Sequence, residues 1–209
     1  MRGKSLKILP KMMHKFYTSL FLIFLSFTIF AQEEKLKLET QSQQQPYETD
    51  LLPASFHKER RDALRELLPD STIAVFFAAP LRKRSNDVYY EYHQDPNFYY
   101  LSGLREPHAL LLIAKDSLGI DSLTDEMLFL SPRDPEEEIW NGRRLGVEGA
   151  EQQLGFDFAK ENRNFNDVAL DFHQFKRVYF ISPEAPEPAD SNDTEQLFGL
   201  HHQFLKQLG

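Results

Sequence analysis

The sequence predicts one α/β domain that follows an amino-terminal export segment. Short apolar runs typical of buried strands alternate with stretches that have helical spacing, which indicates an α/β fold. The length of 209 residues suits one compact domain. A hydrophobic fraction of 41% with 18 Phe and 8 Tyr excludes general disorder.

The domain begins with a predicted helix and a predicted strand. Pro53–Leu68 has apolar residues at helical spacing, with Ser55 as its cap and Pro69 as its stop. The residues of this apolar face are Phe56, Ala63, Leu64, Leu67 and Leu68. Thr72–Ala79 is almost wholly apolar, which predicts a strand buried on both faces.

The middle of the chain predicts two further strands between irregular segments. Ala109–Lys115 and Glu126–Leu130 read as strands joined by a hairpin loop. Before them lie, in order, a polar loop at Pro80–Asp87, a weak alternation at Val88–Tyr92, a turn at Asp95–Asn97, an aromatic stretch at Phe98–Leu101 and a break at Gly103.

The remaining pattern predicts short helices and a last strand. The predicted elements are, in order, a turn at Ser131–Pro135, a helical turn at Glu136–Trp140, a helix at Val147–Leu154 closed by Gly155, an amphipathic segment at Asn166–Phe175, a strand at Arg177–Ile181, a loop at Pro183–Asp193 and a helix at Thr194–Leu208.

Charge and cysteine content exclude several classes of protein. The formal net charge is −8, and the first 31 residues carry five basic side chains and no acidic one. Subtracting this +5 leaves −13 for residues 32–209, which argues against binding nucleic acid or an anionic membrane through charge. The absence of Cys excludes disulfides, thiolate zinc sites, iron–sulfur clusters and a cysteine nucleophile.

Residues 1–31 have the order of a secretory signal peptide. A basic stretch precedes the apolar run at 16–30, and the small residue Ala31 follows it. The run is short for a membrane span, which needs about 20 apolar residues. We therefore expect a secreted or periplasmic protein without stable membrane insertion, with an anchor at 16–30 as the alternative. Residues 32–52 are polar and Gln-rich, which predicts a linker.

The sequence contains few recognisable catalytic or ligand-binding motifs. No nucleophile elbow, zincin motif or nucleotide-binding glycine loop is present. His201 and His202 are adjacent, so on a helix they point apart and make a poor metal site. Glu136–Glu138 suits a hard cation, but a solvated acidic turn paired with Arg143 or Arg144 is the simpler interpretation. This chemistry indicates a binding or scaffold domain.

Two segments nevertheless resemble a known family. Arg84–Ala109 and Glu138–Asp157 together resemble the amino-terminal domain of the Xaa-Pro aminopeptidases (aminopeptidase P) of the creatinase–prolidase group. The matching residues are Arg84, Asp87, Tyr90, Tyr92, Phe98, Tyr100, Gly103, Glu106, Pro107, Ala109, Glu138, Trp140, Gly142, Arg143 and Arg144. His93, Ser102 and Leu104 depart from the family's Arg, Thr and Phe, which affects substrate or interface detail.

The resemblance implies a fold and an activity. The fold is a mixed β-sheet flanked by helices, ribonuclease H-like, over residues 53–209. The family's enzymes release an amino-terminal residue that precedes proline, using two manganese ions in a carboxy-terminal pita-bread domain. That domain's ligands are two Asp, two Glu and a His, and no residue of this sequence matches them. The chain is therefore expected to lack the pita-bread domain, to hold no metal or catalytic residue, and to be inactive alone, as a fragment, a frameshifted product or a separate subunit.

The resemblance also implies site residues and partners. Trp140 is expected near an active site, where its ring would pack on a proline ring; closing the core is the alternative. Arg143 would bind a peptide terminus or fix a domain interface, with a local ion pair as the alternative. The implied partners are a catalytic domain or full-length homologue, further copies in a homo-oligomer, and a proline-containing peptide. A stand-alone peptide-binding or assembly module is the alternative function.

The aromatic residues of the first segment divide into two groups. We expect Phe98 to pack in the core and the tyrosines between 89 and 100 to make interface or domain contacts. Gly103 and Pro107 are expected to be turn residues.

Overall fold

The computed structural model describes Gln32, Lys35, residues 52–86, 88–121, 123–184, Asp193 and residues 195–209. The predicted signal peptide at 1–31, almost all of the predicted linker at 32–52, Asp87 and most of the predicted loop at 183–193 lie outside the described residues. Within the described part, no helix is both long and apolar enough to cross a membrane. The chain divides into two units, one with residues 47–134 and 144–209 and one to which residues 135–143 belong.

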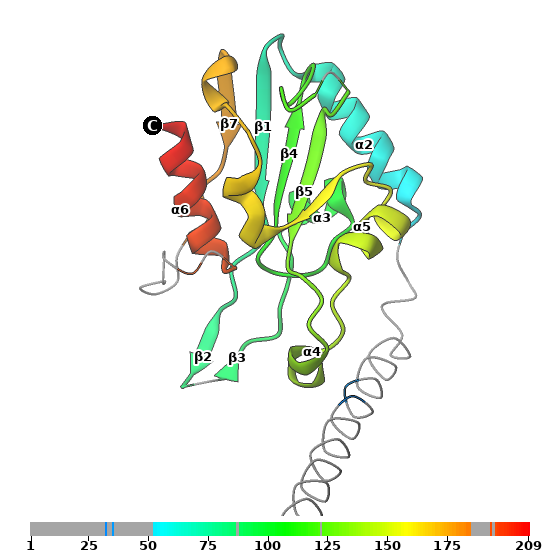
Figure 1. The fold of residues 1–209 in the computed structure, drawn as a ribbon, viewed down its shortest axis with the longest axis vertical. Coiled ribbons are helices and arrows are strands. Elements are labelled where there is room, and N and C mark those ends of the chain that lie inside the picture. Colours follow the sequence, from blue (N-terminus) through cyan, green and yellow to red (C-terminus); the bar gives the residue numbers. More distant parts are fainter. Residues whose placement is uncertain are drawn as a thin grey trace, which may run out of the picture. The chain divides into compact units, whose positions relative to one another are not determined.

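The larger unit is built on a five-stranded mixed sheet in the order β6-β5-β4-β1-β7 (Figure 1). The central strands β1, β4 and β5 pair antiparallel, whereas β7 is parallel to β1 and β6 is parallel to β5. The strands are β1 (Thr72–Phe77), β4 (Leu110–Ala114), β5 (Glu126–Leu130), β6 (Ala159–Glu161) and β7 (Arg177–Phe180). The predicted mixed sheet flanked by helices is confirmed.

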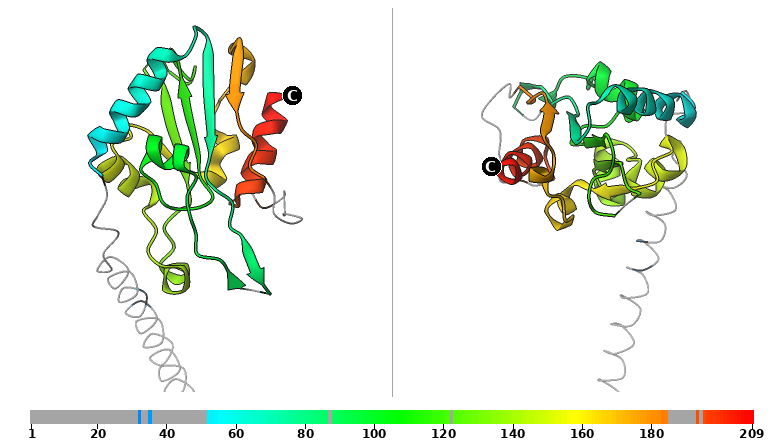
Figure 2. Two further views of the ribbon diagram at one scale, coloured as in Figure 1. Left: turned by 180° about the vertical axis from the view of Figure 1, so that it is seen from behind. Right: turned by 90° about the horizontal axis from the view of Figure 1, so that it is seen from above.

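Helices cover both faces of the sheet and bury a separate apolar core on each side (Figure 2). One core lies under α2 (Ala54–Leu67), α3 (Pro96–Ser102) and α5 (Gly146–Leu154). The opposite core lies under two short 3₁₀ helices and the last helix, namely η1 (Asn162–Asp167), η2 (Phe172–Gln174) and α6 (Leu197–Leu208). The near-continuous apolar character of β1, β4 and β5 follows from this cover on both faces.

A two-stranded hairpin extends away from the large sheet in both side views (Figures 1 and 2). It consists of β2 (Lys83–Ser85) and β3 (Val88–Tyr89), which pair antiparallel. The prediction of a loop over Pro80–Asp87 was therefore wrong for Lys83–Ser85. The polar composition of this stretch hid the strand, because both of its faces are exposed to solvent.

The described part of the second unit contains helix α4 (Pro135–Asn141). Its first turn carries Glu136, Glu137 and Glu138, which suits the positive end of a helix dipole. This helix extends the predicted helical turn at Glu136–Trp140 by one residue at each end.

Several predicted elements were placed wrongly, each for a local reason. Asp95–Asn97 was predicted as a turn but starts α3, where the Asp95 carboxylate accepts from the N–H groups of Asn97 and Phe98, both at 2.9 Å. Pro96 occupies the first turn, where a missing N–H costs nothing. The predicted last helix begins at Leu197, not at Thr194, and the amphipathic segment Asn166–Phe175 contributes to two 3₁₀ helices.

Helix α2 differs from its prediction in its cap and its buried face. Ser55 lies inside the helix, and the N-cap is Pro53, which makes no side-chain capping bond. Leu67, predicted to be on the apolar face, is 82% exposed, whereas His57 and Arg61 are buried. The helix therefore packs through polar side chains that find partners in the core.

Candidate functional site

Both family-like segments leave the sheet at the same end. In the antiparallel ladders Phe77 at the end of β1 pairs with Leu110 at the start of β4, and Leu110 pairs with Phe129 near the end of β5. The segment that contains residues 84–109 connects β1 to β4, and the segment after Leu130 leaves β5 at this edge. The topology thus brings the first segment and the part of the second segment that belongs to the larger unit, residues 144–157, to the same end of the sheet, although they are far apart in the sequence.

Gln94 holds the first of these segments to the sheet. Its Oε1 accepts from the N–H of Ala79 at 2.8 Å and from the hydroxyl of Tyr92 at 2.8 Å. Its Nε2 donates to the carbonyl oxygens of Leu104 at 3.2 Å and Glu106 at 2.8 Å. One amide side chain therefore joins the end of β1 to both sides of the loop around α3. The role of Gln94 was not predicted, because its partners are mostly backbone groups that no sequence motif reveals.

Tyr92 belongs to the same network and is half-buried. Its hydroxyl also approaches the carbonyl oxygens of Ala79 at 3.3 Å and Glu106 at 3.4 Å. Burial raises the pKa of Tyr92 above its ordinary range, so the phenol stays protonated. Tyr92 thus makes contacts inside the chain, whereas Tyr89, Tyr90 and Tyr100 are 52%, 58% and 47% exposed. Phe98 is fully buried, as predicted.

Glu106 links the two family-like segments directly. The side chain is buried, and its Oε1 accepts from the N–H of Leu145 at 2.6 Å. Leu145 immediately precedes α5 and follows Arg143 and Arg144 in the sequence. A carboxylate at position 106 therefore fixes the point at which the second segment rejoins the larger unit.

His108 connects the first segment to the last helix. Its Nδ1 accepts from the N–H of Leu197 at 3.2 Å, so this imidazole satisfies a free donor at the start of α6. The carbonyl oxygen of His108 accepts from Asn162 Nδ2 at 2.9 Å, and the same amide donates to Glu195 O at 2.8 Å. Burial lowers the pKa of His108 to about 4, and the positive charge of Arg144 acts in the same direction as burial.

Gly103 ends α3 in a conformation that suits glycine. Its φ is +75°, and its N–H donates to Tyr99 O at 2.8 Å. A Cβ at this position would lie 2.8 Å from Cδ2 of the His57 ring. The His57 ring is itself fixed by a 2.9 Å contact between Nδ1 and Tyr100 O. The expected turn role of Gly103 is thus combined with a close approach of α2.

The two predicted substrate-binding residues belong to the smaller unit. Trp140 lies in α4 and is 86% exposed, and Arg143 follows the helix and is half-buried. Trp140 and its neighbour Ile139, which is 57% exposed, form an apolar pair on this helix. Arg144 belongs to the larger unit, where its positive charge helps to lower the pKa of His108. The substrate-binding roles of Trp140 and Arg143 stay predictions.

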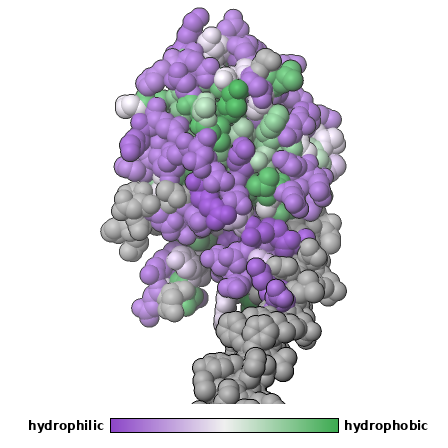
Figure 3. Space-filling model, viewed as in Figure 1, coloured by the Kyte–Doolittle hydropathy of each residue, from purple (hydrophilic) through white to green (hydrophobic). Residues whose placement is uncertain are grey.

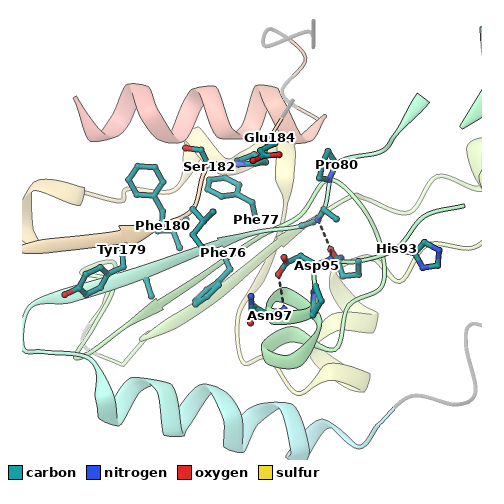
Figure 4. A pocket seen from close by; sticks show the side chains of 18 of the residues that line it. Phe76, Phe77, Pro80, His93, Asp95, Asn97, Tyr179, Phe180, Ser182 and Glu184 are labelled. Carbon is teal, nitrogen blue, oxygen red and sulfur yellow. Dashed lines mark hydrogen bonds between the residues drawn. The ribbon is translucent and has the colours of Figure 1, made fainter. Parts of the chain in front are cut away.

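A cleft of about 680 Å³ opens where the parallel strands β1 and β7 end (Figure 4). Phe77 and Phe180 point toward α6, and Phe76 lies on the opposite face of the sheet. The polar side chains that line it include Arg82, Asp95 and Ser182. The volume falls within the range of ligand pockets, about 300–1,000 Å³. Neither predicted substrate-binding residue lines it.

The described residues do not fit a metal centre. Among them, no group of three or more His, Asp or Glu side chains is arranged to hold an ion. His201 packs edge-on against the ring of Phe77 and lies 3.2 Å from the hydroxyl of Ser182. Burial lowers the pKa of His201.

Comparison with known proteins agrees with this arrangement. Residues 57–182 match the model of the aminopeptidase P N-terminal domain. The chain belongs to this family. The matched range begins in α2, ends just after β7, and includes both family-like segments.

Relatives of the aminopeptidase P family share part of their length with this chain. The Xaa-Pro aminopeptidase of Haemophilus influenzae is 38% identical over 117 residues, which is 56% of this chain and 26% of that protein. The Xaa-Pro aminopeptidase of Escherichia coli is 42% identical over 100 residues, 48% of this chain and 22% of that protein. The chain thus spans about a quarter of the curated relatives that it matches.

A solved structure of zinc-substituted aminopeptidase P from Escherichia coli, in complex with product, has the same fold in this region. The TM-score is 0.55 at 30% sequence identity, and the match covers 76% of this chain and 34% of that one. That relative is a metal-containing enzyme, whereas the match to this chain is confined to one part of it.

Proposed function

We propose that this chain provides the non-catalytic amino-terminal domain of an exported Xaa-Pro aminopeptidase, a metalloaminopeptidase that releases an amino-terminal residue preceding proline. In this role it contributes surface to the enzyme's oligomer and to its substrate channel. The observation that carries the proposal is the family match over residues 57–182. The buried bond between Glu106 and Leu145 supports it, because it couples the two family-like segments at one end of the sheet.

In this proposal the metal chemistry belongs to a different part of the enzyme. Two manganese ions there would polarise the scissile carbonyl and supply the attacking hydroxide. The described residues of this chain supply surface, because their carboxylates and imidazoles are not grouped for coordination. A peptidase assay of the purified chain on Xaa-Pro peptides with added manganese should give no turnover. Clear turnover, abolished by a chelator, would contradict the non-catalytic role.

The chain's contribution to substrate binding centres on Trp140 and Arg143. The exposed indole face suits packing against a proline ring, and the guanidinium suits a bidentate contact with a peptide carboxylate. Trp140 is the only tryptophan of the sequence, so its fluorescence reports this site without labelling.

Titration of the chain with Xaa-Pro and Xaa-Ala peptides tests this role. We expect saturable fluorescence changes with the Xaa-Pro peptides at lower concentration than with the Xaa-Ala peptides. Arg143→Lys keeps the charge but removes the planar fork, so it should weaken the response. Equal responses to both peptide classes, or none up to peptide solubility, would count against substrate binding by this chain alone.

The export part of the proposal rests on the first 31 residues. Their basic stretch, apolar run and Ala31 predict cleavage before Gln32 and a secreted or periplasmic product. Expression of the whole chain in a bacterial host, followed by fractionation and amino-terminal sequencing, tests this. A mature protein that begins at Gln32 supports export, whereas an intact Met1 in the membrane fraction supports the anchor formed by residues 16–30.

A further inference from the structure

The cleft at the ends of β1 and β7 lies where these two parallel strands separate. Their ladder ends at the pair of Val75 and Phe180, whereas β1 continues to Phe77 alongside β4. Residues 76–80 and residues 181–184, which follow this pair along the two segments, all line the cleft except Leu81 and those beyond it. The separation of the strands therefore leaves space for a ligand at the end of the sheet.

The next helices after these two strands lie on opposite faces of the sheet. The next helix after β1 is α3, whose Phe98 and Leu101 belong to the core on one face. The next helix after β7 is α6, whose Leu200 and Phe204 belong to the core on the other face. In α/β sheets, ligands bind in the crevice at the carboxyl ends of parallel strands where the connections diverge in this way. The topology therefore favours ligand binding at this cleft.

Aromatic side chains form one wall of the cleft. Tyr179 pairs with Ala74 in the parallel ladder, so its side chain shares the face of the sheet that carries Phe76. Tyr179 is 49% exposed and Phe76 is half-buried, and in Figure 4 both lie on the side away from α6. Figure 3 shows the other face, with α6 and the 3₁₀ helices, where hydrophilic side chains predominate. The accessible rings suit packing against a planar apolar group of a ligand.

Two side chains of opposite charge also line the cleft. Among the described residues, none makes an ion pair or a hydrogen bond with the guanidinium of Arg82 or with the carboxylate of Glu184. Apart from the imidazole of His93, the remaining charged group is Asp95, whose carboxylate already accepts from the N–H groups at the start of α3. A guanidinium binds a carboxylate bidentately, and a carboxylate accepts from an ammonium group. The cleft thus offers a contact for each charge of a zwitterion.

We propose that this cleft binds a free aromatic α-amino acid in its zwitterionic form. The carboxylate of the ligand pairs with Arg82, its ammonium group pairs with Glu184, and its ring packs against Phe76 and Tyr179. The cleft volume of about 680 Å³ accommodates a ligand of this size together with water. The site contains neither Trp140 nor Arg143, so it does not depend on the substrate contacts of the proposed function.

Ligands that differ in one group test the proposal. L-Phenylalanine carries both charges, N-acetylphenylalanine only the carboxylate, and phenylalaninamide only the ammonium group. In NMR titrations of the purified, isotopically labelled whole chain near neutral pH, we expect saturable shifts of the amide signals of residues 76–79 and 179–182. L-Phenylalanine should bind about threefold more tightly than either blocked ligand. L-Alanine, which lacks the ring, should bind about tenfold more weakly than L-phenylalanine.

Substitution of the two charged residues separates their contributions. Arg82→Gln should remove the advantage of L-phenylalanine over phenylalaninamide and leave its advantage over N-acetylphenylalanine. Glu184→Gln should do the reverse. Arg177→Gln and Glu151→Gln make the same changes at exposed positions that do not line the cleft, and they should alter the affinities by less than about twofold.

The absence of saturable shifts with L-phenylalanine up to its solubility would overturn the proposal. So would shifts confined to other parts of the chain, equal affinities for L-phenylalanine and a blocked ligand, or control variants that weaken binding as much as Arg82→Gln does. The amide spectrum of each variant shows whether it is folded, and the ligand series on the unaltered chain needs no variant. The peptide titration followed at Trp140 concerns the smaller unit, so either proposal can fail without the other.

Discussion

Arg61 and Glu126 form an ion pair, with Nη2 and Oε1 2.9 Å apart, from which water is almost excluded. Their side chains are 0% and 5% exposed, and the contact joins α2 to β5. Arg61 also donates to the carbonyl oxygens of Leu101 at 3.0 Å and Gly155 at 3.4 Å. Its guanidinium carbon lies 4.0 Å from the centre of the Phe156 ring. One buried cation therefore ties α2 to the ends of α3 and α5, which belong to the two family-like segments.

Removal of the Arg61 charge should destabilise the fold strongly. Arg61→Met leaves two carbonyl oxygens without this donor and weakens the neutralisation of Glu126, which keeps a 2.6 Å bond from Arg65. We expect a loss of about 3–5 kcal/mol in the free energy of unfolding, measured with denaturant. Arg60→Met, at a side chain that is 36% exposed, is the control and should change it by less than about 0.5 kcal/mol. Equal effects of the two substitutions would contradict the structural role of Arg61.

Substitution of Gly103 separates backbone strain from steric conflict. Gly103→Ala puts a side chain at φ +75° and places its Cβ 2.8 Å from the His57 ring. Gly142→Ala meets a similar φ of +80° with no described atom within 4 Å. We expect each substitution to lower the free energy of unfolding by about 1–2 kcal/mol, because the left-handed conformation disfavours a Cβ. The contact with the His57 ring should lower it further for Gly103→Ala alone. Indistinguishable unfolding free energies for the two variants would show that α2 does not approach α3 as described.

Replacing the amide of Gln94 by a carboxylate should lower the stability of the fold. Gln94→Glu keeps the acceptor for Ala79 and Tyr92 but replaces the donor to Leu104 O and Glu106 O by a charged oxygen. We expect the free energy of unfolding to fall by about 1–3 kcal/mol, measured with denaturant. Gln152→Glu on the exposed side of α5 is the control. Equal unfolding free energies for the two variants would refute the anchoring role of Gln94.

His108 should make the stability of the chain depend on pH. Above pH 6.5 the imidazole is neutral in both the folded and unfolded states and costs nothing. As the pH is lowered from 6.5 to about 4, the unfolded state takes up a proton at His108 and the folded state does not. The free energy of unfolding therefore decreases as the pH decreases. The full loss is on the order of 3 kcal/mol.

His108→Asn isolates this contribution. Asparagine supplies an acceptor for Leu197 N–H and tolerates the φ of +59°, but it does not titrate in this range. His57 and His201, whose pKa values are also lowered by burial, are present in both proteins and cancel in the comparison. Denaturant unfolding from pH 7 to pH 4 should show a smaller slope for the variant. Identical slopes would mean that His108 is not protected from protonation.

The sequence predicts the strands of the sheet well because their signal is local. β1, β4 and β5 are apolar along most of their length, since both faces are covered. Gly155 closes α5 in the left-handed conformation, as predicted. β6 was not predicted, because its three residues are too few to show an alternation and its partner β5 lies far before it in the sequence.

The candidate site was predicted less completely because its key contacts are not local. The pattern identified Glu106 as a family-like residue, but its bond to Leu145 joins positions that only the fold brings together. Arg61 is buried although it is not among the apolar residues that predicted the buried face of this helix. Gln94 and His108 likewise act on distant backbone groups, which leave no trace in the spacing of residues.

We propose that this chain supplies one part of a peptidase whose metal ions are held by another part. Sequencing the locus and its transcript beyond the Gly209 codon tests it most directly. We expect the following region, in frame or frameshifted, to encode the Asp, Glu and His ligand set of an aminopeptidase P catalytic domain. Unrelated coding sequence in that position would contradict it.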